Sequence, residues 1–205
     1  EKFKRDPIIL PNCIDVGRFS PVDHDVDVPT VGWAGSTSHR SGDIETVRGV
    51  FERFLRDGQI KMYHGGDAVT SPSFASVIGL DDELVERSPR RTTEEYPDLL
   101  TMQIGMVPLR DTPFNMAKSA IKGMEYAASG IPFIAAALPS YREIHELWGG
   151  NFVLAKRPMD WVKGTKRLLD RSYRKELQQS LLESVKQHDI SHGARAWLEV
   201  IEGVV

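Results

Sequence analysis

Lys118, Lys122 and Glu125 carry the charges of a segment that is otherwise rich in apolar and small residues. Spacings of four and three residues put these side chains on one face of a helix. One interpretation is an exposed ladder of ion pairs, which stabilises a helix by about 0.2–0.5 kcal/mol per pair. The other is an anion site, because a lysine in the first turn of a helix opposes the helix dipole unless an anion is bound there. The spacing alone leaves both interpretations open.

A helix from Asn115 to Ala128 is expected to position these three side chains. Asn115 is a suitable N-cap, and apolar residues follow it at helical spacing. Gly130 and Pro132 supply the glycine exit and the proline barrier that end a helix. The dipole and the unpaired N–H groups at the start of such a helix favour an anion.

A glycine-rich loop is the second candidate phosphate site. It follows a short apolar strand and reads Gly32-Trp33-Ala34-Gly35-Ser36-Thr37-Ser38-His39. Its backbone amides and hydroxyl groups suit a phosphate, but its spacing matches neither G-x-G-x-x-G nor a P-loop. Glycines are also needed simply to make a strand-to-helix turn. The loop alone therefore leaves a phosphate site and an ordinary turn open.

Short apolar runs alternate with segments of helical periodicity along most of the chain. The predicted strands cover residues 31–36, 60–64, 84–86, 104–109, 133–137 and 151–154, with a further short strand at 7–12. The predicted helices cover 43–57, 96–102, 115–128 and 139–148, followed by long C-terminal helices after Trp161. The strands are almost continuously apolar, which is typical of a parallel sheet buried on both faces. The sequence therefore predicts an α/β fold, a Rossmann-like doubly wound parallel sheet with helices on both faces.

Two polar residues lie where predicted elements begin or end. Asp43 is expected to cap the helix at 43–57, whose exit is marked by Gly58. His64 ends a predicted strand directly before Gly65-Gly66. It either lines a cleft at the carboxyl edge of the sheet or is an ordinary polar residue at a strand end.

The overall composition excludes several classes of function. A chain of 205 residues suits one substantial domain, and 26 basic and 29 acidic side chains give a formal net charge of -3. Such a chain lacks the broad positive charge of nucleic-acid-binding proteins. No apolar run approaches the roughly 18 residues of a membrane span, and no Cys/His cluster has metal-ligand spacing. We expect no nucleic-acid partner, no transmembrane segment and no metal site, and the single cysteine, Cys13, fits a reducing, cytoplasmic setting.

Four motifs resemble those of family 4 (group 1) glycosyltransferases. The segment Pro11-Asn12-Cys13-Ile14-Asp15, with Phe19 after it, is similar to their interdomain segment. Gly32-Trp33-Ala34-Gly35-Ser36 resembles the first strand and loop of their C-terminal domain. Asp98-Leu99-Leu100 and the strand at 104–109 resemble the approach to the donor site, and Glu125, Ala128, Gly130 and Pro132 match the pattern Glu-x-x-Ala-x-Gly-x-Pro. The resemblance runs from about residue 7 to about residue 180 and implies the C-terminal, nucleotide-sugar-binding half of a GT-B fold.

The resemblance also implies roles for the candidate residues. Glu125 matches the second glutamate of the family's Glu, seven residues, Glu motif and would accept hydrogen bonds from the ribose hydroxyls. Lys118 would meet the diphosphate, and Gly35 and Ser36 would approach it from the opposite loop. Backbone amides from Phe114 to Ser119 would donate along the diphosphate and the sugar. The implied donor-binding set is Gly32, Gly35, Ser36, His64, Phe114, Asn115, Met116, Lys118, Ser119, Lys122 and Glu125, of which Lys118, Glu125 and Asn115 are expected to act in catalysis.

The sequence departs from the family pattern at Ala117. The first glutamate of the motif belongs at this position, eight residues before Glu125. Either Asn115 and backbone amides contact the sugar instead, or the site binds a donor without turnover. The polar residues that remain nearby, including Lys118 and Lys122, favour the first alternative.

The implied reaction is the retaining transfer of a hexose from a nucleoside diphosphate sugar, such as a UDP- or GDP-sugar, to an acceptor hydroxyl. The acceptor would be a glycan, a lipid or a protein, and no cofactor is expected besides the donor substrate. Transfer also needs an acceptor site on a second, N-terminal GT-B domain, so this chain alone is expected to bind donor without appreciable turnover. Two alternatives remain: a nucleotide-sugar epimerase or phosphorylase of the same fold, and a non-catalytic nucleotide-sugar-binding module.

The chain is expected to be part of a longer enzyme, since it begins with Glu1 rather than methionine. Residues 1–25 would form an interdomain linker and strand that enter from the N-terminal domain. Residues 26–185 would form the Rossmann-like donor-binding domain, and residues 186–205 a C-terminal helix. A cytoplasmic location is expected, with peripheral membrane contact only through the N-terminal domain.

Overall fold

Six parallel strands form the sheet of the computed structural model, in the order β3-β2-β1-β4-β5-β6. The model describes residues 8–37, 42–67 and 72–203. The strands are β1 (Thr30–Ala34), β2 (Lys61–Asp67), β3 (Val85–Pro89), β4 (Ile104–Val107), β5 (Phe133–Ala136) and β6 (Val153–Ala155). The parallel order and the helices between the strands confirm the predicted doubly wound α/β fold.

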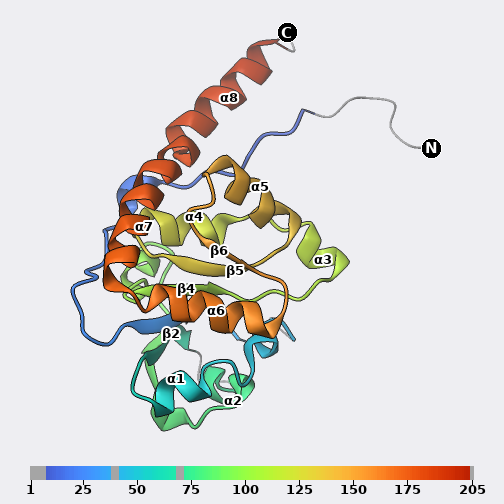
Figure 1. Ribbon diagram of the computed structural model, residues 1–205. Helices are drawn as coiled ribbons and strands as arrows, with labels where there is room; N and C mark the ends of the chain where they lie inside the picture. Colours follow the sequence, from blue (N-terminus) through green and yellow to red (C-terminus); the bar gives the residue numbers. More distant parts are fainter. Residues whose placement is uncertain (1–7, 38–41, 68–71, 204–205) are drawn as a thin grey trace.

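Helices connect the strands and continue beyond the last of them. The α-helices are α1 (Glu52–Arg56), α2 (Phe74–Ile78), α3 (Pro113–Met116), α4 (Ile121–Ala128), α5 (Pro139–Leu147), α6 (Pro158–Leu168), α7 (Arg171–Ser184) and α8 (Ile190–Gly203). The 3₁₀ helices are η1 (Val16–Arg18), η2 (Ile44–Val47), η3 (Asp82–Leu84), η4 (Tyr96–Leu99) and η5 (Val185–His188). Figure 1 shows α4 and α5 on one face of the sheet and α1 and α6 on the other.

Alternation along the strands divides the core between the two faces of the sheet. In β5, Ile134 packs into the cluster on the side of α6, whereas Phe133 and Ala135 pack into the cluster on the side of α4 and α5. Successive side chains of a strand point to opposite faces, so a strand covered on both faces must be apolar throughout. This explains why the strands could be predicted from their apolar runs.

A buried tyrosine links the two central strands. The Tyr126 hydroxyl accepts a hydrogen bond from the Ala34 amide and donates one to the Met106 carbonyl, both at 3.3 Å. The ring packs so closely over β4 that a Cβ on Gly105 would lie 2.6 Å from it. Burial raises the pKa of the Tyr126 phenol, which stays neutral and able to donate. Tyr126 thus fixes α4 on the carboxyl ends of β1 and β4.

The predicted helix at 43–57 is wrong as a single helix. The chain instead forms η2 and then α1, separated by a turn in which Gly49 has φ +74. A glycine adopts this left-handed conformation without the clash that a Cβ would cause. Asp43 does stand at the N-cap position, of η2, but its side chain makes no capping hydrogen bond there. Gly58 does provide the left-handed exit, with φ +65.

The predicted helix at 115–128 is also divided in two. The first piece, α3, is capped by Thr112, whose side chain accepts a hydrogen bond from the Asn115 amide. Asn115 is therefore inside α3 and is not an N-cap. Lys118 lies in the connection between α3 and α4, and α4 begins after Ala120 with no side-chain cap.

Smaller differences concern element ends. Residues 8–13 form no strand; Ile8 and Ile9 are exposed, and Pro7 lies outside the described residues. The segment predicted as a helix at 96–102 forms only the 3₁₀ helix η4, and β2 continues through the two glycines predicted to close it.

Ile14 makes an isolated parallel bridge with Asp189, next to the start of α8.

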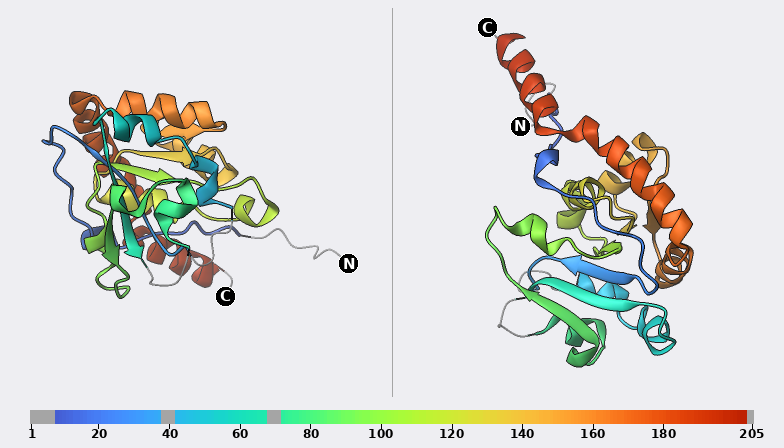
Figure 2. Two further views of the ribbon diagram at one scale, coloured as in Figure 1. Left: turned by 90° about the horizontal axis from the view of Figure 1, so that it is seen from below. Right: turned by 90° about the vertical axis from the view of Figure 1, so that its left-hand side faces the viewer.

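The C-terminal helix α8 extends away from the sheet in Figure 1 and in the right-hand view of Figure 2. Its apolar side chains Trp197, Leu198 and Ile201 are each more than half exposed. The predicted division at residues 25 and 185 stays a prediction.

Replacing Tyr126 with phenylalanine tests the link between β1 and β4. Tyr126→Phe removes both hydrogen bonds and leaves the buried Ala34 amide without this acceptor, so we expect the free energy of unfolding to fall by about 1–2 kcal/mol. Urea unfolding monitored by circular dichroism measures the change. Tyr173→Phe is the control, because Tyr173 is only partly buried, and it should change stability by less than about 0.5 kcal/mol. Equal stability of the two variants would contradict the link.

Candidate functional site

A cavity of about 370 Å³ opens at the carboxyl edge of the sheet, between β1 and β4. The strand order reverses at this point, since β2 and β3 lie on one side of β1 and β4 to β6 on the other. Ligands of open α/β sheets bind at such switch points. The cavity is lined by Trp33, Asp43, Ile44, Val107, Pro108, Leu109, Lys118, Ser119, Ile121, Lys122, Glu125 and Tyr141. We call it the donor cavity, after the ligand that the resemblance implies.

A buried carboxylate forms one wall of the donor cavity. Asp43 is only 5% exposed. Its Oδ1 atom accepts hydrogen bonds from the Arg110 amide at 3.0 Å and from the Asn115 Nδ2 atom at 2.6 Å. Its Oδ2 atom lies 3.5 Å from the Lys118 amino group. A buried charge needs such partners, and these partners join the start of η2 to the segment that follows β4.

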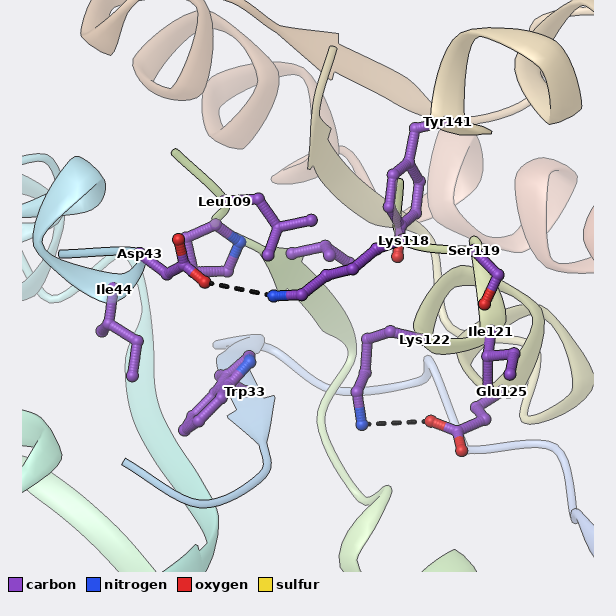
Figure 3. Close-up of a pocket in the computed structure, with 12 residues that line it drawn as sticks. Trp33, Asp43, Ile44, Leu109, Lys118, Ser119, Ile121, Lys122, Glu125 and Tyr141 are labelled. Atoms are coloured by element: carbon purple, nitrogen blue, oxygen red, sulfur yellow. Dashed lines mark hydrogen bonds and ion pairs between the residues drawn. The ribbon is translucent and has the colours of Figure 1, made fainter. Parts of the chain in front are cut away.

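The two lysines approach the cavity from consecutive parts of the chain. Figure 3 shows Lys118 extending toward Asp43 and Lys122 toward Glu125, with Trp33 facing the same cavity. Lys118 belongs to the connection before α4, and Lys122 belongs to the first turn of α4. The interpretation as an exposed ladder on one helix is therefore wrong for Lys118, whose partner is Asp43.

Glu125 is held by two partners in the donor cavity. The Tyr96 hydroxyl donates to the Glu125 Oε2 atom at 2.9 Å, and the Lys122 amino group lies 3.0 Å from the same oxygen. Lys122 also donates to the Tyr96 hydroxyl. Burial, followed by the negative charge of Glu125, raises the pKa of Tyr96, so the phenol stays protonated as a donor. The glutamate is thereby fixed in one orientation.

Gly35 and Ser36 of the glycine-rich loop line a neighbouring cavity, whereas its Trp33 lines the donor cavity. This second cavity, of about 270 Å³, is lined by Gly35, Ser36, Gly66, Arg90, Arg91, Tyr96 and Leu99. Tyr96 belongs to this lining and is hydrogen-bonded to Glu125. Tyr96 therefore lies between Gly35 and Ser36 on one side and Lys122 and Glu125 on the other. Ser38 and His39 of the loop lie outside the described residues.

His64 supports the glycine-rich loop from within the core. It is fully buried, and its Nε2 atom lies 2.9 Å from the Gly35 carbonyl oxygen, which accepts the hydrogen bond. The imidazole packs against Trp33 and Phe74, with ring centroids 5.3 and 4.9 Å away, and those two rings also contact each other at 5.8 Å. Burial lowers the pKa of His64, so the neutral form predominates near pH 7. His64 lines neither cavity and positions Gly35.

The remaining candidates lie outside the donor cavity. Phe114 is 76% exposed, and its ring lies 4.9 Å below the Lys118 amino group. Met116 is about half exposed. Asn115 is buried, and its Nδ2 atom also donates to the Arg110 carbonyl, so its amide supports Asp43. Gly32 is buried in β1, where a Cβ would lie 3.0 Å from Met102. Ala117, where the family motif has a glutamate, is exposed.

Sequence reasoning missed three residues of the site. Asp43 precedes a helical segment and therefore had the pattern of an N-cap. Tyr96 is remote in sequence from Glu125, and no local pattern signals their hydrogen bond. Trp33 was interpreted as a core residue; it is buried, and it also lines the donor cavity.

Two further observations concern the described part of the chain. Among its residues, no group of three or more His, Cys, Asp and Glu side chains is placed to hold a metal ion. None of its helices has the length and apolar character needed to cross a membrane.

Removing the Asp43 carboxylate should destabilise the fold. Asp43→Ala takes away the acceptor of the Arg110 and Asn115 hydrogen bonds and the partner of Lys118, so we expect the free energy of unfolding to fall by about 2–4 kcal/mol. Chemical denaturation of Asp57→Ala supplies the control. Asp57 makes an exposed ion pair with Arg53 at 3.5 Å, and its loss should cost less than about 1 kcal/mol. Similar losses for both variants would show that the hydrogen bonds of Asp43 stabilise the fold no more than an exposed ion pair does.

The buried His64 should make stability depend on pH. Its pKa is lowered from 6.5 in the folded state, so as the pH falls below 6.5 the unfolded chain binds the proton first. Stability is therefore complete above pH 6.5 and declines below it, by at most about 1.4 kcal/mol per pH unit for this one group. His24 and His188, whose pKa values are also lowered by burial, act in the same direction.

His64→Phe keeps an aromatic ring in the stack and removes the titrating group. Denaturant titrations between pH 7.5 and 5 should show a smaller loss of stability on acidification in the variant than in the parent chain. Parallel curves for the two proteins would show that His64 does not titrate as its burial implies.

Comparison with known proteins gives a match in sequence over part of the chain. No family model matches the chain. A putative teichuronic acid biosynthesis glycosyltransferase of Bacillus subtilis, TuaH, is 26% identical over 93 residues, which are 43% of this chain and 23% of that protein.

Similarity in structure extends over nearly the whole chain. A glycosyltransferase of Rickettsia africae superposes with a TM-score of 0.70 at 12% identity, over 96% of this chain and 57% of that one. Anabaena Alr3699/HepE, solved in complex with UDP-glucose, gives a TM-score of 0.66 at 13% identity over 95% and 57% of the two chains. The C-terminal domain of LpcC, a group 1 family glycosyltransferase of Francisella tularensis, gives a TM-score of 0.61 at 17% identity over 85% and 97%.

The matched chains differ in how much of their own length this chain covers. This chain spans little more than half of the Rickettsia and Anabaena chains but nearly all of the excised LpcC domain. The expected resemblance is thereby confirmed: the chain has the fold of the C-terminal half of a GT-B glycosyltransferase of the group 1 type.

Proposed function

We propose that this chain is the donor-binding half of a glycosyltransferase and that the donor cavity holds a nucleoside diphosphate sugar. The observation that carries the proposal is the meeting of Lys118, Lys122 and Glu125 in one cavity at the switch point of the sheet. The position suits a nucleotide in this fold, and the charges suit a diphosphate next to a ribose. UDP-glucose in the Anabaena neighbour supports this class of ligand.

The diphosphate would bind between Lys118 and the start of α4. The Lys118 amino group faces the donor cavity beside Asp43. The N-cap residue of α4 is Ala120, which has no polar side chain to accept from the first amides of the helix. These amides and the helix dipole favour an anion. A bound diphosphate would give Lys118 a second negatively charged partner beside Asp43 and would accept from the amides at the helix start.

The ribose would bind to Glu125. Within the described part of the chain, the contacts from Tyr96 and Lys122 both go to the Oε2 atom. Oε1 is thereby left to accept hydrogen bonds from the ribose hydroxyls, and charge-assisted hydrogen bonds of this kind are strong. Tyr96 and Lys122 would hold the carboxylate in position for the ribose.

The reaction would be the transfer of a hexose to an acceptor hydroxyl with retention at the anomeric carbon. The bond between that carbon and the diphosphate breaks, and its electron pair leaves with the diphosphate. The acceptor oxygen forms a new bond to the same carbon, and the proton of its hydroxyl passes to the departing diphosphate. Lys118 and the start of α4 would stabilise the negative charge that develops. A glycan, lipid or protein acceptor would bind with the help of a second domain, and the chain alone would bind donor without turnover. No cofactor or metal enters this scheme.

A second candidate, a binding module without turnover, is favoured by Ala117. No carboxylate stands at this position, and the amide of the neighbouring Asn115 is held by Asp43 and the Arg110 carbonyl. The expected replacement of the motif glutamate by Asn115 is therefore not supported by its contacts. Release of free nucleoside diphosphate by the complete protein, in the presence of acceptor, separates the two functions.

Calorimetric titration with UDP-glucose, GDP-mannose and ADP-glucose tests the proposal. One of these donors should bind, and both Lys118→Ala and Glu125→Gln should weaken its binding by about 10- to 100-fold, since each removes a charge-assisted contact. Lys166→Ala, which changes an exposed lysine of α6, should bind like the parent chain. The proposal fails if no nucleotide binds, or if both site variants retain the parental affinity.

A further inference from the structure

A basic cavity beside the donor cavity has no role in the scheme above. Its volume is about 570 Å³, and it shares Leu109 with the donor cavity. It is lined by Thr46, Leu109, Arg110, Asp111, Ala136, Ala137, Leu138, Arg142, Ala155, Lys156, Arg157, Pro158 and Trp161. We call it the basic basin.

The basic basin lies at the carboxyl ends of β5 and β6. Its floor is apolar and includes the buried residues Ala136, Leu138 and Trp161. Its basic side chains come from three separate connections: Arg110 after β4, Arg142 on α5, and the Lys156-Arg157 pair between β6 and α6. Strand ends and the loops after them form the ligand-binding edge of a parallel sheet.

The charges of the basin are not balanced within the described part of the chain. Four basic side chains line it, against one acidic side chain, Asp111, although the whole chain has a net charge of -3. Arg157 pairs with Asp160 at 3.6 Å. For Arg142 and Lys156, no described carboxylate lies within ion-pair distance of 4.0 Å. Cations gathered without counter-charges attract an anion from solution.

The start of α5 adds to this attraction. Leu138 lines the basin and is the N-cap residue of α5, a helix of nine residues whose first position is Pro139. The Leu138 side chain has no polar atom to cap the helix, and the dipole of α5 favours an anion at this end. In α6, by contrast, Asp160 already accepts from the amides of Lys156 and Arg157.

We propose that the basic basin binds the phosphate group of a phosphate-bearing acceptor, an inference that rests on the proposed function. Arginine binds phosphate oxygens through two parallel hydrogen bonds, and both Arg110 and Arg142 line this cavity. The cavity exceeds the size of one phosphate, which leaves room for an attached group over Trp161. The two cavities adjoin at Leu109, which lines both of them. A molecule anchored by its phosphate in the basin would therefore extend toward a donor bound in the donor cavity and place its hydroxyl beside the donor sugar.

Two tryptophans allow the two cavities to be followed separately. Trp33 lines the donor cavity, and Trp161 lines the basin. Trp148 and Trp197 line neither of them and serve as internal references. The chain is labelled with 5-fluorotryptophan, each ¹⁹F resonance is assigned by a Trp→Phe variant, and sn-glycerol 3-phosphate and UDP-glucose are titrated in turn. Glycerol phosphate should shift the Trp161 resonance saturably, and UDP-glucose should shift that of Trp33.

Variants on the rim of the basin give the decisive comparison. Arg142→Ala and Lys156→Ala change exposed residues and should each weaken glycerol phosphate binding at least fivefold while leaving the UDP-glucose titration unchanged. Lys166→Ala, on the same helix as Trp161 but outside the basin, should bind glycerol phosphate like the parent chain. The inference is overturned if all three variants bind it equally, or if it shifts no resonance and the vesicles below also fail to bind.

Vesicles distinguish a soluble acceptor from a lipid. The parent chain and Arg142→Ala are sedimented with vesicles of phosphatidic acid in phosphatidylcholine and with phosphatidylcholine alone. Binding to the phosphatidic acid vesicles that is lost in Arg142→Ala identifies a lipid phosphate, whereas glycerol phosphate binding without vesicle binding identifies a soluble phosphate. A basin that binds phosphate while UDP-glucose, GDP-mannose and ADP-glucose all leave the Trp33 resonance unshifted would contradict the proposed function and leave the anion site standing.

Discussion

The buried carboxylate of Asp43 joins the segments on which the donor cavity depends. It connects the start of η2 to the Arg110 amide, to Asn115 in α3 and to Lys118 before α4. Burial of this charge is costly unless it is paired and hydrogen-bonded. The chain therefore folds locally so that its partners converge on it, and Lys118 is directed into the cavity as a consequence.

Both lysines of the donor cavity have acidic partners before any ligand binds. Lys118 lies beside Asp43, and Lys122 beside Glu125 and Tyr96. A diphosphate that binds here shares the lysines with these partners, so the gain in Coulomb energy is smaller than for isolated cations. The side chains are already ordered, which would lower the entropy cost of binding a diphosphate. In the proposed reaction the same order would hold Lys118 in position for the transition state.

The fold was predictable because strands buried on both faces must be apolar runs, as β4 and β5 are. The breaks in the helices were not, since a helical pattern persists across Gly49 and across the connection that holds Lys118. The predicted grouping of Lys118 with Lys122 and Glu125 holds in space, although the reason differs: a tertiary contact with Asp43, not a shared helix face, brings Lys118 there. Contacts of this kind have no local signal, and neither does the hydrogen bond from Tyr96 to Glu125.

The two cavities on this edge differ in how they can recognise an anion. The donor cavity lies at the switch point, and its lysine side chains are only 22% exposed, so water and salt screen its charges incompletely. The basic side chains of the basin are exposed, and charges in water are screened within about 8–10 Å at physiological salt. The proposed phosphate binding would therefore have two different salt dependences at the two cavities. Binding in the basin would weaken steeply as salt is added. Donor binding between β1 and β4 would depend more on hydrogen bonds from Lys118 and the start of α4 to the diphosphate, and from the ribose to Glu125, than on the long-range field.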